Sequence, residues 1–309
     1  MNILTLKSIN YNDFSFEFME YIKNKSQLFN SSSSTIICDS NTDSCYIMNI
    51  RVVNYYLDSK GESHINCDNT ITYNKIIYID KKFNIIREQY MITDLTGNIP
   101  YYGIEDIRLF HFKDAIYFIG SSYNEKTKKI QIVSNILDLS NNYFEPKFIN
   151  PSFQTNYDWE KNWVFFNNNG KINVIYKWYP IYICSIDYET QQLNLIQKNS
   201  NVPTFFERFR GSTNGVEYDN KIWFIVHFHK KRNKNKPEYI HNFVVFDTDM
   251  NLLGYSNPFK FENFIVEYCI GMILNEDNNF IITYSTLDKT SKLIVLDKKY
   301  VKSLIIPVY

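Results

Sequence analysis

The chain has little of the residues that divide or cross-link proteins. Its 309 residues include only 9 glycines and 8 prolines, and no Pro/Gly/Ser-rich linker or run of like charge separates two halves. We therefore expect one domain over residues 1–309. The 5 cysteines are scattered and odd in number, without CxxC spacing. This pattern favours reduced thiols in a cytoplasmic setting, and it argues against a disulfide framework or a structural metal.

Two further absences limit the partners. Lys plus Arg equals Asp plus Glu at 33 each, unlike the basic surface of a protein that neutralises many phosphates. No apolar stretch is long enough to cross a bilayer, and the first residues lack the pattern of a secretory signal. We therefore expect no nucleic acid, no membrane span and a cytoplasmic location. The basic run 230–236 is interpreted as a solvated loop, with binding to an anionic glycan, lipid or nucleic acid as the alternative.

Aromatic residues are abundant instead. Tyr and Phe number 25 and 24, and many stand in short runs with Ile and Val that suit half-buried strands. Few segments have a 3.6-residue period, and residues 14–29 are the best helix candidate. The serine tract Ser31–Ser34 is expected to be a loop. The chain is predicted to be all-β.

A repeated pattern indicates the architecture. A polar cluster, a short strand, a tight turn and a second strand recur with a period of roughly 50 to 60 residues, the size of a four-stranded propeller blade. The turns have hairpin chemistry and lie at 113–114, 169–170, 219–220 and 277–279. A more degenerate copy lies within residues 45–89. We predict a five-bladed β-propeller, with a lead-in over residues 1–30 that closes the ring or packs beneath it.

The repeat also places a candidate site. The innermost strand of each blade lines the central axis, so polar residues at the strand starts should converge in one funnel. Converging acids and bases suit chemistry at a glycosidic bond, which needs a carboxylic acid to move a proton at the bridging oxygen. The predicted ring of charge consists of Arg51, Glu105, Asp106, Arg108, Glu160, Lys161, Arg210 and Glu267.

Within this ring, Asp106 is the predicted proton donor. Strand alternation would place Asp106 and Arg108 on one face and Glu105 on the other. Arg108 would then orient Asp106, and Glu105 would support the blade or contact sugar hydroxyls. The alternative is that the acids and the arginine only tie neighbouring blades together.

Two more groups complete the predicted site. His227 could hold phosphate or another anion together with Arg210 and Lys161, or it could be a hydrogen-bonding histidine at a blade edge. Trp163 is the best candidate for stacking on a sugar ring, although most tryptophans in β proteins pack between blades. No spacing of His, Cys and carboxylate residues suggests a metal, and no cofactor is expected.

The residues resemble a known family at this point. Gly103-Ile-Glu-Asp-Ile-Arg108 is similar to the Gly-x-Glu-Asp-Pro-Arg signature of the five-bladed propeller mannoside phosphorylases and hydrolases, glycoside hydrolase family 130, and of the related β-1,2-mannosyltransferases. Residues 265–271 and 282–288 look like the last-blade pattern of that family, and Val226-His227 resembles its phosphate-site motif. The resemblance covers roughly residues 45 to 300. Ile107, Phe228 and Ser285 depart from the motifs, where the family has proline, glycine and glycine.

The resemblance implies specific roles. It makes Asp106 the proton donor, gives His227 and basic side chains to phosphate or its replacement, and places Tyr284 and Asp288 among the sugar contacts. It also implies an inverting mechanism on a β-mannoside or a related sugar, with phosphate, a sugar phosphate or a nucleotide sugar as possible partners. The first hypothesis is therefore a glycosyltransferase, phosphorylase or hydrolase. The others are a non-catalytic glycan-binding or scaffold propeller and a protein-interaction propeller.

Overall fold

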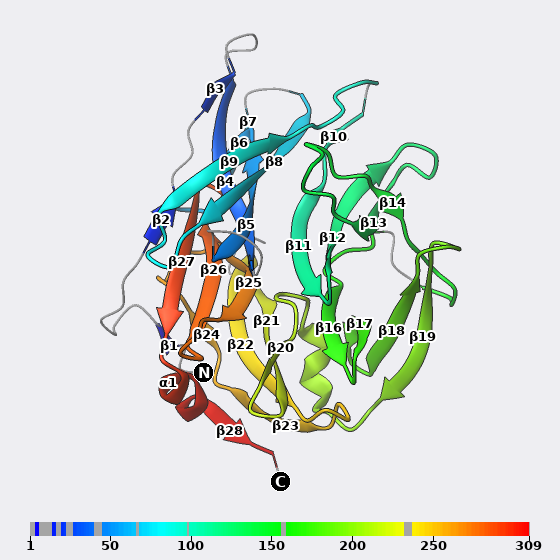
Figure 1. The fold of residues 1–309 in the computed structure, drawn as a ribbon, viewed down its shortest axis with the longest axis vertical. Coiled ribbons are helices and arrows are strands. Elements are labelled where there is room, and N and C mark those ends of the chain that lie inside the picture. Colours follow the sequence, from blue (N-terminus) through cyan, green and yellow to red (C-terminus); the bar gives the residue numbers. More distant parts are fainter. Residues whose placement is uncertain are drawn as a thin grey trace.

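The computed structural model describes residues 4–5, 14–16, 20–22, 27–39, 45–65, 68–97, 99–155, 159–231 and 237–308. These residues form five mainly antiparallel blades arranged around one axis, a five-bladed β-propeller, together with a separate two-stranded sheet (Figure 1). The fold predicted from the repeat is confirmed, and each turn predicted within a blade joins two paired strands of that blade.

The strands of each blade follow the chain order. Blade 1 contains β4 (Gln27–Cys38), β5 (Tyr46–Val53), β8 (Thr70–Ile79) and β9 (Ile85–Met91), and blade 2 contains β11 (Glu105–Phe112), β12 (Ala115–Asn124), β13 (Lys129–Ile136) and β14 (Lys147–Phe148). Blade 3 contains β16 (Val164–Asn168), β17 (Lys171–Trp178), β18 (Ile181–Asp187) and β19 (Gln192–Asn199). Blade 4 contains β20 (Val216–Tyr218), β21 (Lys221–Lys231), β22 (Pro237–Phe246) and β23 (Leu252–Ser256), and blade 5 contains β25 (Glu267–Leu274), β26 (Phe280–Thr286) and β27 (Thr290–Leu296).

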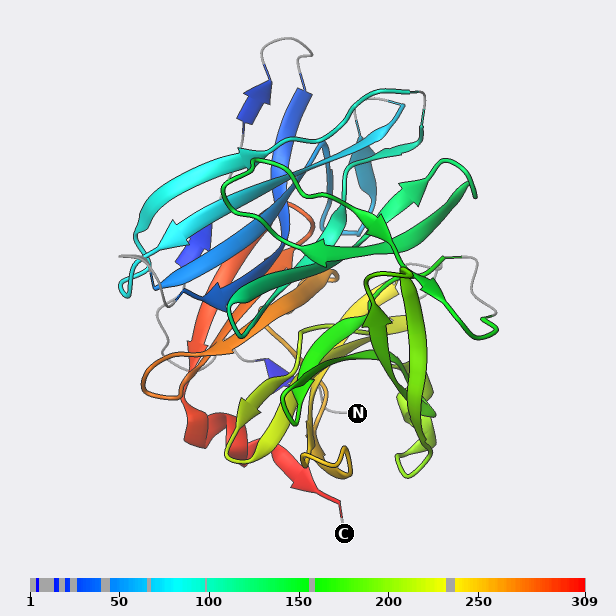
Figure 2. The ribbon, with the colours of Figure 1, turned by 45° about the vertical axis from the view of Figure 1, so that its right-hand side comes forward.

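Short elements fill the edges. They are β1 (Leu4–Thr5), β3 (Glu20–Ile22), β6 (Tyr55–Leu57), β7 (Ser63–Ile65), β10 (Tyr101–Tyr102), β15 (Asn150–Pro151), β24 (Phe259–Lys260), the 3-10 helix η2 (Thr204–Arg208), α1 (Lys298–Ser303) and β28 (Ile305–Pro307). Figure 2 shows α1 and β28 at the edge of the molecule beside the C-terminus, where β28 pairs with β23. No helix among the described residues has the length and apolar character to cross a bilayer.

The N-terminal segment closes the ring. β2 (Phe14–Phe16) pairs antiparallel with β27 as the outer strand of blade 5, so the two ends of the chain share one sheet. The helix predicted over residues 14–29 is therefore wrong where the structure describes it, since β2, β3 and the start of β4 are strands. Unpaired backbone groups at the open edge of a sheet bond readily to a further strand, and this tertiary pairing prevails over a weak helical period.

The serine tract is the second correction. Ser31–Ser34 is not a loop but the middle of β4, the first strand of blade 1, and all four side chains are buried. The ladder between β4 and β5 shifts register between Ser31 and Ser34. Small side chains allow close approach of strands near the axis, and their hydroxyls can bond to groups of other blades. Because the serine tract belongs to β4, the first strand of the blade, Arg51 lies on the second strand, β5.

Apolar faces of neighbouring blades form the core. Between blades 3 and 4, Trp178 packs edge-on against Phe224 with ring centroids 5.3 Å apart, and its ring lies 6.3 Å from that of Phe246. Similar clusters of Ile, Val and aromatic side chains fill other interfaces between blades. The aromatic runs of the sequence are thus used mainly to join blades, and they hold the ends of the inner strands in fixed positions around the axis.

Candidate functional site

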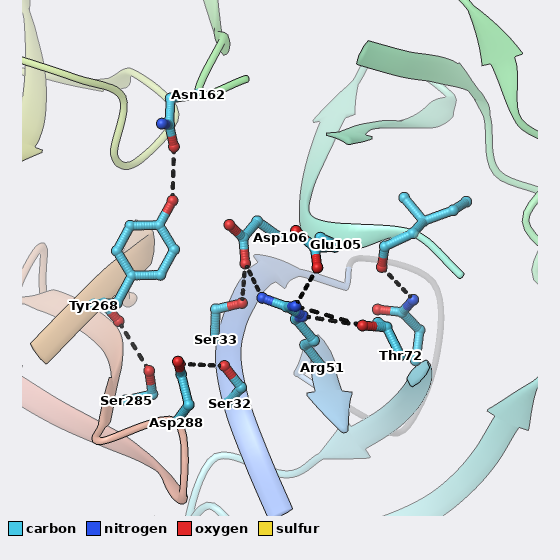
Figure 3. A network of polar contacts seen from close by, with 12 residues as sticks. Ser32, Ser33, Arg51, Thr72, Glu105, Asp106, Asn162, Tyr268, Ser285 and Asp288 are labelled. Atoms are coloured by element: carbon cyan, nitrogen blue, oxygen red, sulfur yellow. Dashed lines mark hydrogen bonds and ion pairs between the residues drawn. The ribbon is translucent and has the colours of Figure 1, made fainter. Parts of the chain in front are cut away.

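A buried arginine gathers two carboxylates at the axis. The Nη2 atom of Arg51 lies 2.7 Å from Oε1 of Glu105, and its Nη1 lies 3.0 Å from Oδ1 of Asp106 (Figure 3). Asp288 from the turn between β26 and β27 faces the same group, accepting a hydrogen bond of 2.7 Å from the Ser32 hydroxyl. We call Arg51, Glu105, Asp106 and Asp288, with Ser32 and Ser33, the acid cluster.

An irregular strand start brings both carboxylates to Arg51. Asp106 has φ of 51°, and the β11–β12 ladder shifts register between Glu105 and Arg108. Gly103 just before it has φ of 87°, and a Cβ there would lie 2.1 Å from the Thr72 carbonyl oxygen. Only glycine fits this approach. The prediction that Glu105 and Asp106 point to opposite faces is therefore wrong, because regular alternation holds only in a continuous ladder.

Arg108 holds the backbone of this site and not the Asp106 carboxylate. Its guanidinium donates to the carbonyl oxygen of Asp106 at 3.0 Å and also to that of Ser212. The same group donates to the Tyr268 hydroxyl at 3.1 Å and lies 3.4 Å from Oδ1 of Asn162. Arg108 is buried and joins segments of four blades, so it combines positioning of the main chain with the blade-tying role considered for it.

The pKa values of the three carboxyls are shifted in different directions. Burial raises the pKa of Asp106, but the charges of Arg51 and Arg108 and a hydrogen bond of 2.8 Å from Ser33 outweigh it, so that the pKa is lowered. For Glu105, burial outweighs the attraction of Arg51 and raises the pKa. Burial likewise raises the pKa of Asp288. One ionised carboxylate thus lies beside two groups that hold protons more readily, an arrangement suited to proton transfer.

Several members of this site were missed from the sequence. Ser32 and Ser33 bind the two aspartates, and Tyr268 donates to Asn162 at 2.7 Å across the axis. The serine tract is the sequence signal for the first two, and by composition alone it predicts a loop. A serine tract that directly precedes a strand pattern is compatible with a loop, but it is equally compatible with buried hydroxyl groups inside a strand.

A cavity with a positive rim adjoins the acid cluster. It has a volume of about 210 Å³ and is lined by residues that include Lys161, Arg210, His229 and the exposed Trp159. We call it the basic cavity. Partial burial and the charges of Lys161 and Arg210 lower the pKa of His229 to about 4, so this imidazole is neutral near pH 7. Asn162 also lines this cavity and lies 3.4 Å from the Arg108 guanidinium that bonds to the Asp106 carbonyl oxygen, which places the cavity next to the acids.

His227 lies deeper than expected for an anion ligand. Its ring is buried, its Nδ1 is 2.9 Å from the Ser212 hydroxyl, and burial holds its pKa well below the ordinary value. His229, two residues further along β21 and on the same face, lines the basic cavity in its place. Of the predicted anion-binding residues, Lys161 and Arg210 lie at the cavity and His227 lies behind it.

Four other predicted sugar contacts are engaged within the fold. Glu160 accepts hydrogen bonds from Trp163 Nε1 at 3.3 Å and from the Tyr176 hydroxyl at 3.0 Å, and Trp163 is only 1% exposed. Glu267 accepts the backbone N–H groups of three residues in the loop 261–264. Tyr284 donates to Glu262 at 2.7 Å and its ring stacks on Phe261. These contacts explain the positions of the side chains without a ligand.

Metal binding has no support in this part of the chain. Among the described residues, no group of three or more His, Cys, Asp or Glu side chains is arranged to hold a metal ion. Arg51 already provides the positive charge between the carboxylates of the acid cluster.

Comparisons with known proteins identify the fold. The sequence matches no known family profile and no curated protein. Among solved structures, it is similar to a β-1,2-mannobiose phosphorylase of Listeria innocua, with 12% identity, a TM-score of 0.62, and 95% and 99% of the two chains covered. A mannose phosphorylase of Leishmania mexicana in complex with phosphate gives 10% identity, a TM-score of 0.53, and coverage of 91% and 87%. A GDP-Man-dependent mannosyltransferase of the same organism gives 12%, 0.52, and coverage of 88% and 87%.

Proposed function

We propose that the protein is a carbohydrate-active enzyme that forms or cleaves a glycosidic bond, with inversion, on a β-mannoside or a similar sugar. The observation that carries this proposal is the acid cluster, in which Arg51 separates an ionised Asp106 from Glu105 with its raised pKa. The names of the similar structures support the same class of chemistry, since they include two phosphorylases and a mannosyltransferase.

Asp106 is the proposed proton-transfer residue. The group that donates a proton when a glycosidic bond is cleaved must accept one when the bond is formed. The lowered pKa of Asp106 means that its resting state is the carboxylate, which is ready to accept a proton from an acceptor hydroxyl. This favours bond formation as the direction for which the resting enzyme is prepared. In cleavage, Asp106 must first take up a proton, and it then acts as the predicted donor.

Neighbouring groups would bind the sugar and the leaving group. Arg51, Glu105 and Asp288 present polar oxygen and nitrogen atoms around Asp106 that can bond to sugar hydroxyls. Lys161 and Arg210 at the basic cavity carry the positive charge needed to hold phosphate or a phosphoryl leaving group. The neutral imidazole of His229 can donate one hydrogen bond to the same anion. The acid cluster would thus bind the sugar on one side of the reacting bond, and the basic cavity would bind the phosphate or leaving group on the other side.

The test compares synthesis and phosphorolysis in one preparation. The protein is incubated with mannose and either mannose 1-phosphate or GDP-mannose, and separately with β-1,2-mannobiose and phosphate, and products are resolved by chromatography. Asp106→Asn should lower the rate by about 10²–10⁴, the usual contribution of general acid–base catalysis. Asp219→Asn, an exposed aspartate paired with Lys302, is the matched control and should retain the wild-type rate. Undiminished turnover by Asp106→Asn would refute the assigned role.

A glycan-binding propeller without catalysis is the second candidate. Its support is that both Arg51 and Ser33 already occupy Oδ1 of Asp106, as in a structural ion pair. This candidate predicts calorimetric binding of β-1,2-mannobiose that is weakened by Asp288→Asn, with no product after long incubation under any of the conditions above.

A further inference from the structure

A second pocket lies next to the basic cavity and has different chemistry. It has a volume of about 230 Å³, and its lining includes Phe205, Arg208, Phe209, Phe228, Asn242 and Tyr255. We call it the aromatic pocket. Phe209 lines both this pocket and the basic cavity, so the two adjoin. The volume is below the range of about 300–1,000 Å³ that encloses a drug-sized ligand, which suits a single ring system.

The walls of the aromatic pocket favour a flat ring. Phe205 is 41% exposed, and its centroid lies 5.4 Å from that of Tyr255 in an edge-on arrangement. The Arg208 guanidinium lies 5.1 Å from the centre of Phe228. Exposed aromatic faces stack well on heteroaromatic rings, and the guanidinium at the edge of the pocket can meet an attached phosphate. A sugar ring would bring hydroxyls around its whole edge, and in this pocket most of them would lose water without gaining a partner.

Asn242 is a buried polar residue of the pocket wall. The residue is 3% exposed, and its Nδ2 donates to the Ser256 carbonyl oxygen at 2.7 Å. Its Oδ1 has no hydrogen-bond partner within the part of the chain that the structure describes. A buried acceptor without a donor costs free energy, and a small rotation of the amide toward the pocket would let the N–H group of a bound ring remove that cost. The wall thus combines stacking surfaces with a polar amide next to them, a combination that suits a nucleobase.

Positive side chains connect the aromatic pocket to the acid cluster. Arg208 lies in the aromatic pocket, and Arg210 and Lys161 lie in the basic cavity. At the far end, Asn162 also lines the basic cavity and lies 3.4 Å from the Arg108 guanidinium, which bonds to the backbone of Asp106. A ligand extending along this path would meet aromatic rings, then three cations, then the carboxylates. This order matches a base, a diphosphate and a sugar.

We infer that the aromatic pocket binds the base of a nucleoside diphosphate sugar, whose diphosphate lies along Arg208, Arg210 and Lys161 and whose sugar reaches the acid cluster. This inference rests on the proposed function and selects its donor class, a nucleotide sugar over a sugar 1-phosphate. In the transfer, the acceptor hydroxyl gives its proton to Asp106 and its oxygen bonds to the sugar carbon. The bond from that carbon to the diphosphate breaks, and the nucleoside diphosphate leaves with the electron pair.

Calorimetric titration with GDP, without sugar or acceptor, tests the pocket directly. Wild type should bind GDP, and Phe205→Ala should weaken binding about 5- to 150-fold, the loss expected for one base–aromatic stack. Phe205 is partly exposed, so its removal leaves the core intact. Tyr143→Ala, an aromatic residue 43% exposed outside this pocket, is the matched control and should bind as wild type does. A second variant, Arg208→Ala, should weaken GDP binding more than guanosine binding, because it removes a phosphate contact.

The outcomes separate this inference from the proposed function. Absence of GDP binding, or unchanged binding by Phe205→Ala, overturns the nucleotide pocket. Weakened binding of β-1,2-mannobiose by Phe205→Ala, with GDP unaffected, also overturns it and makes the pocket a sugar site. Asp106→Asn should bind GDP as wild type does. If turnover depends on Asp106 but requires mannose 1-phosphate and no nucleotide, the proposed function stands and this inference fails.

Discussion

Removal of Arg51 is the sharpest test of the acid cluster. Arg51 is 5% exposed and is bonded to two carboxylates, Glu105 and Asp106. Arg51→Met keeps much of the side-chain volume and removes the charge. The two carboxylates then remain buried without their main countercharge. Breaking a buried ion pair by removing one partner costs about 3–5 kcal/mol, and this is the loss of unfolding free energy that we expect near pH 7.

The loss should depend on pH with a defined sign. In the wild type, the pKa of Asp106 lies below its unfolded value of 3.8, so its ionisation stabilises the fold at pH values above 3.8. The pKa of Glu105 lies above its unfolded value of 4.5, so this group reduces the stability of the fold as the pH rises above 4.5. Without Arg51, both pKa values should rise, because each carboxyl loses the charge that lowers its pKa most. Relative to the wild type, each carboxyl then costs stability as the pH rises from its wild-type folded pKa to its folded pKa in the variant, by up to about 1.4 kcal/mol per pH unit. The difference from wild type should therefore be largest near pH 7 and decline toward pH 4.

Urea unfolding at several pH values between 4 and 7.5 measures this effect. Arg87→Met is the control, because Arg87 is exposed and only lies over the Tyr78 ring at 3.9 Å, a contact worth below about 1 kcal/mol. Adding Glu105→Gln and Asp106→Asn to Arg51→Met should restore part of the stability at pH 7. A loss that is the same at every pH, or no larger than that of Arg87→Met, would show that the carboxylates do not depend on Arg51 for their charge state.

Three further predictions concern groups around the site. Glu267→Gln should cost about 1–3 kcal/mol of unfolding free energy, because it places an NH₂ group or a weaker acceptor opposite three backbone N–H donors. The KM for sugar should stay at the wild-type value, and a raised KM would show that Glu267 belongs to the binding site. Gly103→Ala should lower the free energy of unfolding by roughly 1–3 kcal/mol more than Gly170→Ala does in chemical unfolding. Both glycines have positive φ, but of the two only Gly103 has atoms within contact distance of the added Cβ. Equal losses would contradict the close approach of Gly103 to Thr72. His241 is buried with neither ring nitrogen bonded among the described residues, and burial, with the charge of Lys260, lowers its pKa to about 3, so wild-type stability should fall as the pH drops from 6.5 toward 3. His241→Leu should reduce that slope by up to about 1.4 kcal/mol per pH unit, and an unchanged slope would assign the acid sensitivity to other groups.

The sequence alone determined the architecture because blades are local. A hairpin turn such as Asn169-Gly170, with φ of 51° and 75°, is specified by its own residues, and it recurs at the blade period. Apolar runs on both sides of each turn then require burial on both faces of the sheet. These local rules predicted five blades, their turns and the polar start at Gly103–Arg108.

Only the tertiary structure decided which polar residues meet at the axis and with what charge. Periodicity placed Glu105 and Asp106 on opposite faces, but a register shift brings both to Arg51, which lies on another blade. Glu267 also lies at a polar strand start, as Glu105 and Asp106 do. The loop 261–264 folds over it, however, and the backbone N–H groups of that loop donate to its carboxylate. The pKa values of the three acids depend on burial and on charges from distant segments, which no local pattern encodes. Ser32 and Ser33 show the same limit, because a hydroxyl becomes a ligand for an aspartate only when ring closure brings the two together.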